Sequence, residues 1–167
     1  MTTTDEELLL GLLNSTPLVA GRERDDLTAT TAWQQWLSTR GDLTEPEGRA
    51  PLTAVRAALQ DVVRGDQPSS ALTPFLRGIR STPTLTPDGV EWTLTGPPRT
   101  LIPARAVLAW DAVQQARPGR LRPCGNDECQ LFLLDRSKAN TARWCSMQSC
   151  GNRMKARRHY ESRTRQD

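Results

Sequence analysis

Residues 124–150 read CGNDECQLFLLDRSKANTARWCSMQSC, and the four cysteines of this stretch decide how the C-terminal part of the chain folds. Cys124 and Cys129 form one close pair and Cys145 and Cys150 form another, in the pattern C-x4-C-x15-C-x4-C. A tetrahedral metal site is typically built from two such pairs, because each pair sits on a local turn and the chain between them folds back. The stretch therefore predicts a metal-bound module.

Zinc is the metal that this pattern favours. Four thiolates fill a tetrahedral coordination sphere and leave no position for water or substrate, so one Zn²⁺ bound here is expected to be structural rather than catalytic. An iron–sulfur cluster or a redox-active dithiol pair is the competing interpretation. A module this small buries little apolar surface, and we therefore expect the metal to supply most of its folding free energy.

The residues between the cysteines add detail to the expected module. Gly125 and Asn126 tolerate left-handed backbone conformations, which would let backbone amides face a thiolate. Residues 132–134 are Phe, Leu and Leu and predict a short strand packed on the module. Trp144, beside Cys145, is expected to belong to the core of the module rather than to form a platform for a nucleic-acid base.

A basic helix is predicted after the second cysteine pair, from Met147 to about Arg163. Met147, Cys150 and Met154 share one face, but beyond about Ala156 the same face continues in polar residues. This part of the helix has no apolar face to bury, so it must project into solvent or lie against a partner. Its spread arginines suit a groove with phosphates on both walls, and they also suit a disordered tail. The residues expected to contact nucleic acid are Arg143, Asn152, Arg153, Lys155, Arg157 and Arg158.

The charge of the chain is unevenly distributed. Residues 1–120 carry 12 Lys and Arg against 14 Asp and Glu, whereas residues 121–167 carry 10 against 5. A basic segment on a near-neutral body is typical of proteins that contact nucleic acid, although a solvated tail has the same composition. The charge pattern is thus consistent with DNA as a partner but does not require it.

No segment has the properties of a membrane span or of a secretory signal. The apolar run over residues 8–13 is far shorter than the roughly 20 residues that a spanning helix needs. Three acidic residues, at positions 5–7, precede this run where a secretory signal would carry positive charge. We therefore expect a cytoplasmic protein without a membrane partner, and stable disulfides are rare in that compartment.

Residues 1–120 predict a mainly α-helical body, because apolar residues recur at helical spacing between Gly and Pro residues that end helices. The expected helices run from Thr4 to about Leu13, over 30–39, over 52–63, after Pro68, and over about 101–115 with Pro103 in the first turn. The helix after Pro68 is expected to bury Leu72, Phe75, Leu76 and Ile79.

One β-hairpin is expected near residues 82–96. Val90, Trp92 and Leu94 alternate onto one face of its second strand. The preceding Pro87-Asp88-Gly89 has turn chemistry, because proline presets φ and glycine accepts a positive φ. The expected fold class is therefore mainly α with a small β-hairpin (α+β), followed by a C-terminal four-cysteine zinc finger with a basic helix.

The C-terminal residues also resemble a known family. Cys150-Gly151-Asn152-Arg153 resembles the signature of the CGNR zinc-finger family. Residues 132–140, 143–147 and 155–157 are similar to that family as well, so the resemblance covers residues 121–165. It implies a zinc site at the four cysteines and a stress-induced transcription regulator of the bacterial type.

A looser similarity extends into the N-terminal part of the chain. Residues 12–16, residues 36–37 and the region 101–108 are similar to the ABATE domain that accompanies the finger in this family. The resemblance implies two domains. These are an ABATE-like helical domain over 1–120 and a CGNR-type zinc finger over 121–167.

The leading functional hypothesis is a zinc-finger DNA-binding transcriptional regulator. The basic helix would contact DNA, and the N-terminal body would sense a small-molecule effector or form a homodimer. The alternative is a zinc-stabilised protein–protein interaction module without direct DNA binding. Enzymatic activity is not expected, because the sequence contains no P-loop, dinucleotide fingerprint or nucleophile elbow.

Overall fold

The structure is a computed structural model that describes residues 3–19, 21–28, 31 and 49–164. The helix expected over 30–39 falls outside the described residues except for Thr31. No helix of the described residues combines the length and the apolar composition that crossing a membrane requires.

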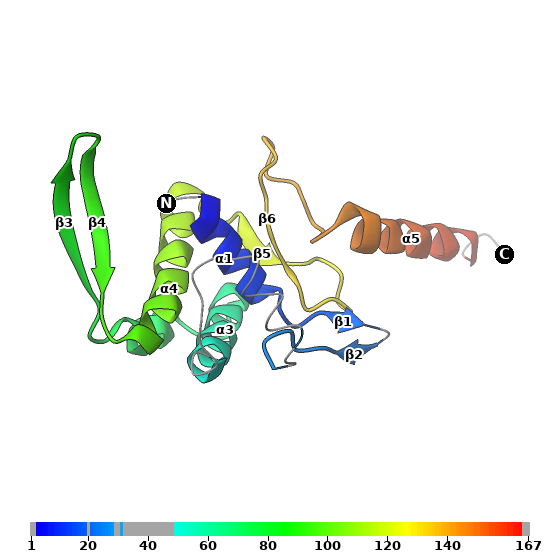
Figure 1. Cartoon of the computed structure of the whole chain (residues 1–167). Helices are drawn as coiled ribbons and strands as arrows, with labels where there is room; N and C mark the ends of the chain where they lie inside the picture. Colours follow the sequence, from blue (N-terminus) through cyan, green and yellow to red (C-terminus); the bar gives the residue numbers. More distant parts are fainter. Residues whose placement is uncertain (1–2, 20, 29–30, 32–48, 165–167) are drawn as a thin grey trace.

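In the part of the chain that the structure describes, three α-helices form the body, and small two-stranded antiparallel sheets surround them (Figure 1). The body helices are α1 (Thr3–Leu13), α3 (Arg49–Arg64) and α4 (Pro98–Ala116), with the 3-10 helix η2 (Ser69–Leu76). The sheets pair β1 (Leu18–Val19) with β2 (Arg22–Glu23), β3 (Arg80–Thr86) with β4 (Gly89–Thr95), and β5 (Leu121–Pro123) with β6 (Phe132–Leu134). A π-helical turn, η3 (Met147–Gly151), leads into α5 (Asn152–Thr164). The expected mainly α fold class is confirmed.

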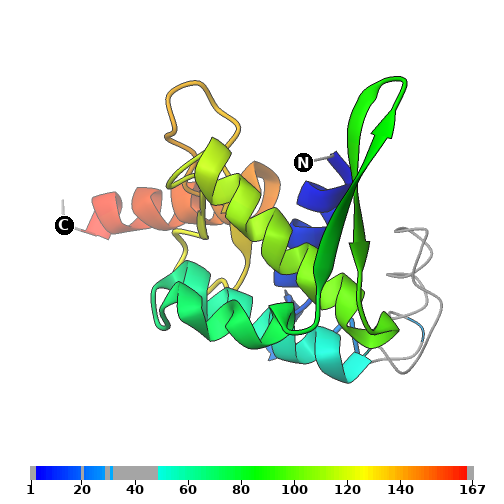
Figure 2. The same ribbon diagram turned by 90° about the vertical axis from the view of Figure 1, so that its left-hand side faces the viewer.

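Among the described residues, one hydrophobic cluster holds the body together. Helix α4 packs against α1, α3 and η2, and α1 also packs against α3 (Figure 2). The largest fully buried members of the cluster are Leu9, Leu12, Leu13, Leu27, Leu52, Val55, Leu59, Leu72, Val113 and Phe132. Phe132 and Leu121 of the same cluster come from the sequence after residue 120, so the core is continuous from the helices into the β5–β6 hairpin.

Two expectations about the helices are corrected. The segment after Pro68 forms a 3-10 helix rather than an α-helix, and of its expected stripe only Leu72 is buried, whereas Leu76 is exposed. Pro74 inside this segment lacks the N–H that an α-helical turn requires there. Helix α4 begins at Pro98 rather than near Leu101, because a proline at the first helical position has no hydrogen bond to lose. Pro103 therefore lies inside the helix rather than in its first turn, where it was expected.

The hairpin expected near 82–96 is confirmed as β3 and β4. Thr86 pairs with Gly89, so Pro87 and Asp88 form a two-residue turn. Gly89 has a φ of +125°, a conformation that other residues rarely adopt.

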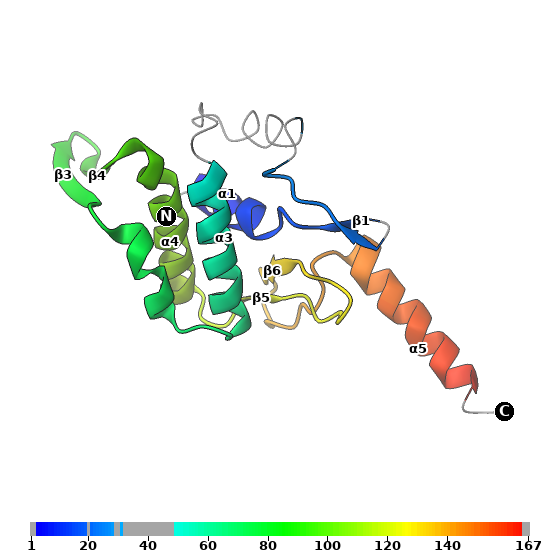
Figure 3. The same ribbon diagram turned by 90° about the horizontal axis from the view of Figure 1, so that it is seen from below.

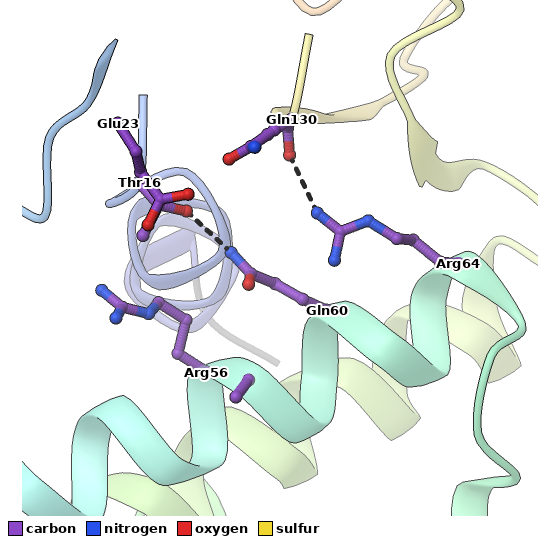
Figure 4. A pocket seen from close by; sticks show the side chains of 7 residues that line it. Thr16, Glu23, Arg56, Gln60, Arg64 and Gln130 are labelled. Atoms are coloured by element: carbon purple, nitrogen blue, oxygen red, sulfur yellow. Dashed lines mark hydrogen bonds between the residues drawn. The ribbon is translucent and has the colours of Figure 1, made fainter. Parts of the chain in front are cut away.

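A polar anchor fixes the chain after α1 to the side of α3. The Arg56 guanidinium donates to both carboxylate oxygens of Asp25 at 2.7 Å and to the Ser15 hydroxyl at 3.0 Å. These hydrogen bonds from Arg56 hold the pKa of Asp25 below its usual range. Figure 4 shows Arg56 beside Gln60 on α3, and Gln60 donates to Thr16 at 3.1 Å.

The β5–β6 hairpin is attached to the body by the side chain of Asn14. Its Oδ1 accepts a hydrogen bond from the Phe132 N–H at 2.7 Å, and its Nδ2 donates to the Phe132 carbonyl at 3.1 Å. The side-chain amide thus pairs with the edge of β6 as a neighbouring strand would. From α3, the Arg64 guanidinium lies 4.8 Å from the Phe132 ring centroid and donates to the Gln130 carbonyl at 3.3 Å (Figure 4).

Replacement of Asn14 by Ala is expected to lower the free energy of unfolding by about 2 kcal/mol, because it leaves both polar groups of Phe132 without their partner. Urea unfolding of the zinc-loaded protein measures the change. The exposed Gln67→Ala is the matched control and should change stability by less than about 0.5 kcal/mol. Equal losses in the two variants would contradict this role for Asn14.

Candidate metal centre

The four cysteines of the C-terminal module converge on one point. Their sulfur atoms all lie within 4.8 Å of one another, and the Cys129–Cys145 and Cys145–Cys150 sulfur pairs are each separated by 3.7 Å. A zinc ion with Zn–S bonds of about 2.3 Å in a tetrahedron places its sulfurs about 3.8 Å apart. The cluster has the dimensions of a site for one Zn²⁺, and its sulfurs are too far apart for disulfides.

Two turns supply the four ligands. Cys124 directly follows β5, and its N–H donates to the Leu131 carbonyl, which closes the loop that carries Cys129. Cys145 precedes η3, and Cys150 lies inside it. Cys124 and Cys150 are buried and the other two cysteines are half-buried, so protein surrounds most of the site.

Hydrogen bonds reach two of the sulfurs from the surrounding chain. The backbone N–H of Cys145 donates to the Cys124 sulfur at 3.4 Å, and the Asn126 side-chain amide donates to the Cys150 sulfur at 3.5 Å. Asn126 is only 1% exposed, and its backbone carbonyl accepts from the Cys129 N–H at 2.8 Å. Such donors stabilise thiolate charge and orient the ligands.

The expected left-handed backbone at Gly125 and Asn126 is wrong, because neither residue has a positive φ. The glycine is explained by close packing instead. A Cβ at Gly125 would lie 3.0 Å from the Arg143 carbonyl oxygen and 3.4 Å from the Trp144 ring. Asn126 acts through its side-chain amide rather than through its backbone conformation.

The electrostatics of the cluster fit a bound dication. Burial raises the pKa of Cys129 to about 11 and raises the pKa of Cys145 as well, where the neighbouring Cys129 thiolate adds to the effect. Burial also raises the pKa of Cys150, but hydrogen bonds led by Asn126 outweigh it and hold this pKa below its usual value. Four thiolates so close together require a compensating cation, and soft sulfur donors in a tetrahedron select zinc.

Trp144 belongs to the core of the module, as expected. A Cβ added at Gly125 would lie 3.4 Å from the Trp144 ring, and a Cβ added at Gly151 would lie 3.3 Å from it. The Met147 sulfur also packs against Gly151, because a Cβ added at Gly151 would lie 2.9 Å from it. Two glycines therefore allow the indole to lie directly against the metal-binding turns.

A buried carboxylate that the sequence analysis did not single out organises the loop over residues 135–142. Asp135 accepts hydrogen bonds from the Ser137 N–H at 2.8 Å, the Ala142 N–H at 2.8 Å and the Arg122 guanidinium at 2.6 Å. These interactions, led by those with Ser137, lower the pKa of Asp135 to about 2. Asp side chains commonly bond the backbone N–H two residues on in an Asx turn, and this tendency is the signal that could have identified Asp135.

The side chains expected to contact nucleic acid are brought to the surface around α5. Arg143, Asn152, Arg153, Lys155, Arg157 and Arg158 are all exposed. Three of them have partners within the module, and the first is Asn152, whose side-chain amide donates to the Gln148 carbonyl at 3.2 Å. The Arg143 guanidinium stacks 5.2 Å from the Trp144 ring centroid, and Arg157 pairs with Glu161 at 3.1 Å and with Glu128 at 3.9 Å.

The metal site sets the start and the direction of α5. Cys150 lies in the π-helical turn that runs directly into α5, and the Ser146 hydroxyl caps this turn by accepting from the Ser149 N–H. In η3 and the first turn of α5, Cys150 is buried, Met154 is half-buried and Met147 is exposed, while residues 155–163 are all exposed. As expected, α5 projects away from the body (Figure 3).

Replacement of Cys150 by Ser is expected to reduce zinc from one ion per chain to a small fraction, because the serine hydroxyl is a poor replacement for a thiolate. Elemental analysis of the purified protein measures the zinc content, and far-UV circular dichroism reports the accompanying loss of helix. The exposed neighbour variant Gln148→Ala should keep its zinc. Full zinc occupancy in Cys150→Ser would exclude the four-cysteine site.

Replacement of Asn126 by Ala is expected to raise the dissociation constant for zinc by about 10–100-fold, because the Cys150 thiolate loses its side-chain donor. Competition with a chromogenic chelator measures this constant. The adjacent exposed variant Asp127→Ala serves as the control and should bind zinc like the wild type. An unchanged constant in Asn126→Ala would show that this donor does not tune the metal.

Comparison with known proteins agrees with this geometry. Residues 120–163 match the family model described as CGNR zinc finger. A search of curated proteins found no match to the chain. The four-cysteine cluster lies within the matched segment, and this C-terminal module is therefore a zinc finger of the CGNR family.

Proposed function

We propose that the protein is a DNA-binding regulator in which the zinc finger holds α5 against the nucleic acid. The observation that carries this proposal is that α5 is exposed to solvent, has a basic surface, and is anchored at its start by the metal-binding turn that contains Cys150. Five of the thirteen residues of α5 are Lys or Arg, and Glu161 is its single acidic residue. A helix without an apolar face gains nothing from packing on the body, but it suits a polyanionic partner.

The distribution of ion pairs identifies the cations available to a partner. Among the residues that the structure describes, Arg157 is engaged by Glu161 and Glu128, whereas no ion pair of Arg153, Lys155 or Arg158 is found. Lys155 and Arg158 are three positions apart and share one side of the helix, whereas Arg153 lies on the other side, since successive residues turn by about 100°. A groove with phosphates on both walls is a surface that such a helix can enter.

The donor set of the metal site supports binding rather than catalysis. Four cysteines satisfy a tetrahedral Zn²⁺ and leave no open coordination position for a substrate. In this proposal the N-terminal body regulates the finger, either by forming a homodimer or by binding a small-molecule effector.

Charge reversal of Arg153, Lys155 and Arg158 to Glu is expected to weaken binding to duplex DNA at least about 100-fold, because three phosphate contacts are lost. In the wild type, log Kd should depend on log salt concentration, and the slope should fall by about 3 in the variant. Fluorescence anisotropy at several salt concentrations measures both quantities.

The matched control reverses three exposed arginines of the body, Arg77, Arg80 and Arg99, which gives the same change in net charge. Zinc content and thermal unfolding verify that both variants fold. If the two variants lose DNA affinity equally, only net charge matters and α5 is not the contact. If the wild type binds no DNA at low salt, the finger acts instead as a protein-interaction module.

A further inference from the structure

A basic pocket lies between the end of α4 and the loop over residues 135–142, two segments that lie close together in Figure 2. Its volume is about 490 Å³, and four cationic side chains line it. These side chains, which we call the junction cations, are Arg117, Arg120, Arg136 and Lys138. The first two lie between α4 and β5, and the other two follow β6. The pocket therefore joins the helical body to the zinc finger.

Two of the junction cations share a single carboxylate. Arg117 and Arg136 both pair with the buried Glu6 of α1, at 3.2 Å and 3.0 Å. Asp135 also lines the pocket, but its side chain is 0% exposed and pairs with Arg122 at 2.6 Å. Its negative charge is thus compensated outside the set of junction cations.

The other two junction cations have no carboxylate partner. Within the part of the chain that the structure describes, neither Arg120 nor Lys138 forms an ion pair. The Arg120 guanidinium donates to the backbone carbonyls of Asp135, at 3.1 Å, and of Ser137. These hydrogen bonds hold the guanidinium in place and leave its charge uncompensated, while Lys138 is exposed. The pocket consequently has an excess of positive charge.

The dipole of α4 does not account for this excess. A helix C-terminus attracts cations, because its last carbonyls carry partial negative charge. Among the described residues, however, the side-chain hydrogen bonds of the junction cations go to Glu6 and to the carbonyls of Asp135 and Ser137. None of these acceptors belongs to α4, so α1 and the finger loop position the guanidiniums.

We propose that this pocket binds a phosphate group. Three guanidiniums and an ammonium held close together repel one another, and a bound anion removes that repulsion. The planar fork of arginine fits two phosphate oxygens at once, and the arginines here approach from two different segments of the chain. A small phosphorylated molecule and the backbone of DNA both offer this group.

An anion in this pocket would connect the body to the finger. It would bridge the segment that follows α4 and the loop that leads to Cys145 and the second cysteine pair. Pockets at the boundary between structural units are frequent ligand sites. The phosphate site does not depend on DNA binding by α5.

Titration of the zinc-loaded full chain with inorganic phosphate, followed by amide NMR at constant ionic strength, tests the site. The Arg120 and Lys138 amide signals are expected to shift saturably, with a dissociation constant of about 0.1–5 mM. Sodium chloride at the same ionic strength should not produce these shifts.

Lys138→Glu is the most informative variant, because this exposed side chain has no partner to lose and the fold should be retained. It is expected to raise the dissociation constant for phosphate at least about tenfold, since it reverses one of the four charges around the anion. The matched control is Arg99→Glu, which reverses an exposed charge at the other end of α4 and should bind phosphate like the wild type.

A titration of labelled duplex DNA with the same two variants identifies the source of the phosphate. If the DNA backbone occupies the pocket, Lys138→Glu weakens DNA binding more than Arg99→Glu does. If a small phosphorylated molecule occupies it, the two variants bind DNA alike.

Three results would overturn the proposal. The first is the absence of saturable shifts of the Arg120 and Lys138 amides in the wild type. The second is equal phosphate affinity in Lys138→Glu and Arg99→Glu. The third is loss of phosphate binding when the charges of Arg153, Lys155 and Arg158 are reversed, because the anion would then lie on α5.

Discussion

Coordination by four closely placed thiolates is the constraint on which the C-terminal half of the finger depends. Residues 135–151 contain no strand and only one helical turn, so few backbone hydrogen bonds hold them in place. Cys145 and Cys150 join this segment to the turn that carries Cys124 and Cys129. Without that link, the turn η3 and the start of α5 would have little to fix their orientation. The metal therefore converts an exposed basic segment into a helix with a defined direction.

The finger is in turn built into the body. Asn14 pairs with the backbone of Phe132, and the Phe132 side chain lies in the same cluster as the leucines of α1 and α3. Glu6 of α1 is buried and pairs with Arg136 at 3.0 Å and with Arg117 at 3.2 Å. A movement of α1 relative to α3 would consequently displace the β5–β6 hairpin, because these contacts join the hairpin to α1. This connection provides a physical route by which an event in the body could affect the finger.

Features with a local cause could be predicted from the sequence. The cysteine spacing specified the metal site, and Pro87 and Gly89 specified the hairpin turn, because each depends on residues close in the chain. The segment after Pro68 shows the limit of periodicity, since its apolar spacing predicts a helix with a buried stripe, whereas the structure has a 3-10 helix in which only Leu72 is buried. The two-domain division and the contacts of α5 with DNA stay predictions.

Features that join distant residues could not be predicted in this way. Asn14 and Phe132 are 118 positions apart, and nothing local to either residue indicates the pairing. Asn126 was correctly placed in the metal-binding turn, but its role depends on a side-chain contact with Cys150 that only the folded finger creates. The exposure of Trp92 likewise follows from where the hairpin leaves the body and not from its alternating pattern.

The central claim is that zinc creates the DNA-binding surface by fixing α5. The most direct test is to titrate labelled duplex DNA with zinc-loaded protein, with protein stripped by a chelator, and with stripped protein to which Zn²⁺ or Mg²⁺ is returned. The account predicts that stripping abolishes binding and that Zn²⁺ restores it whereas Mg²⁺ does not. Equal DNA affinity in the loaded and stripped proteins would contradict it.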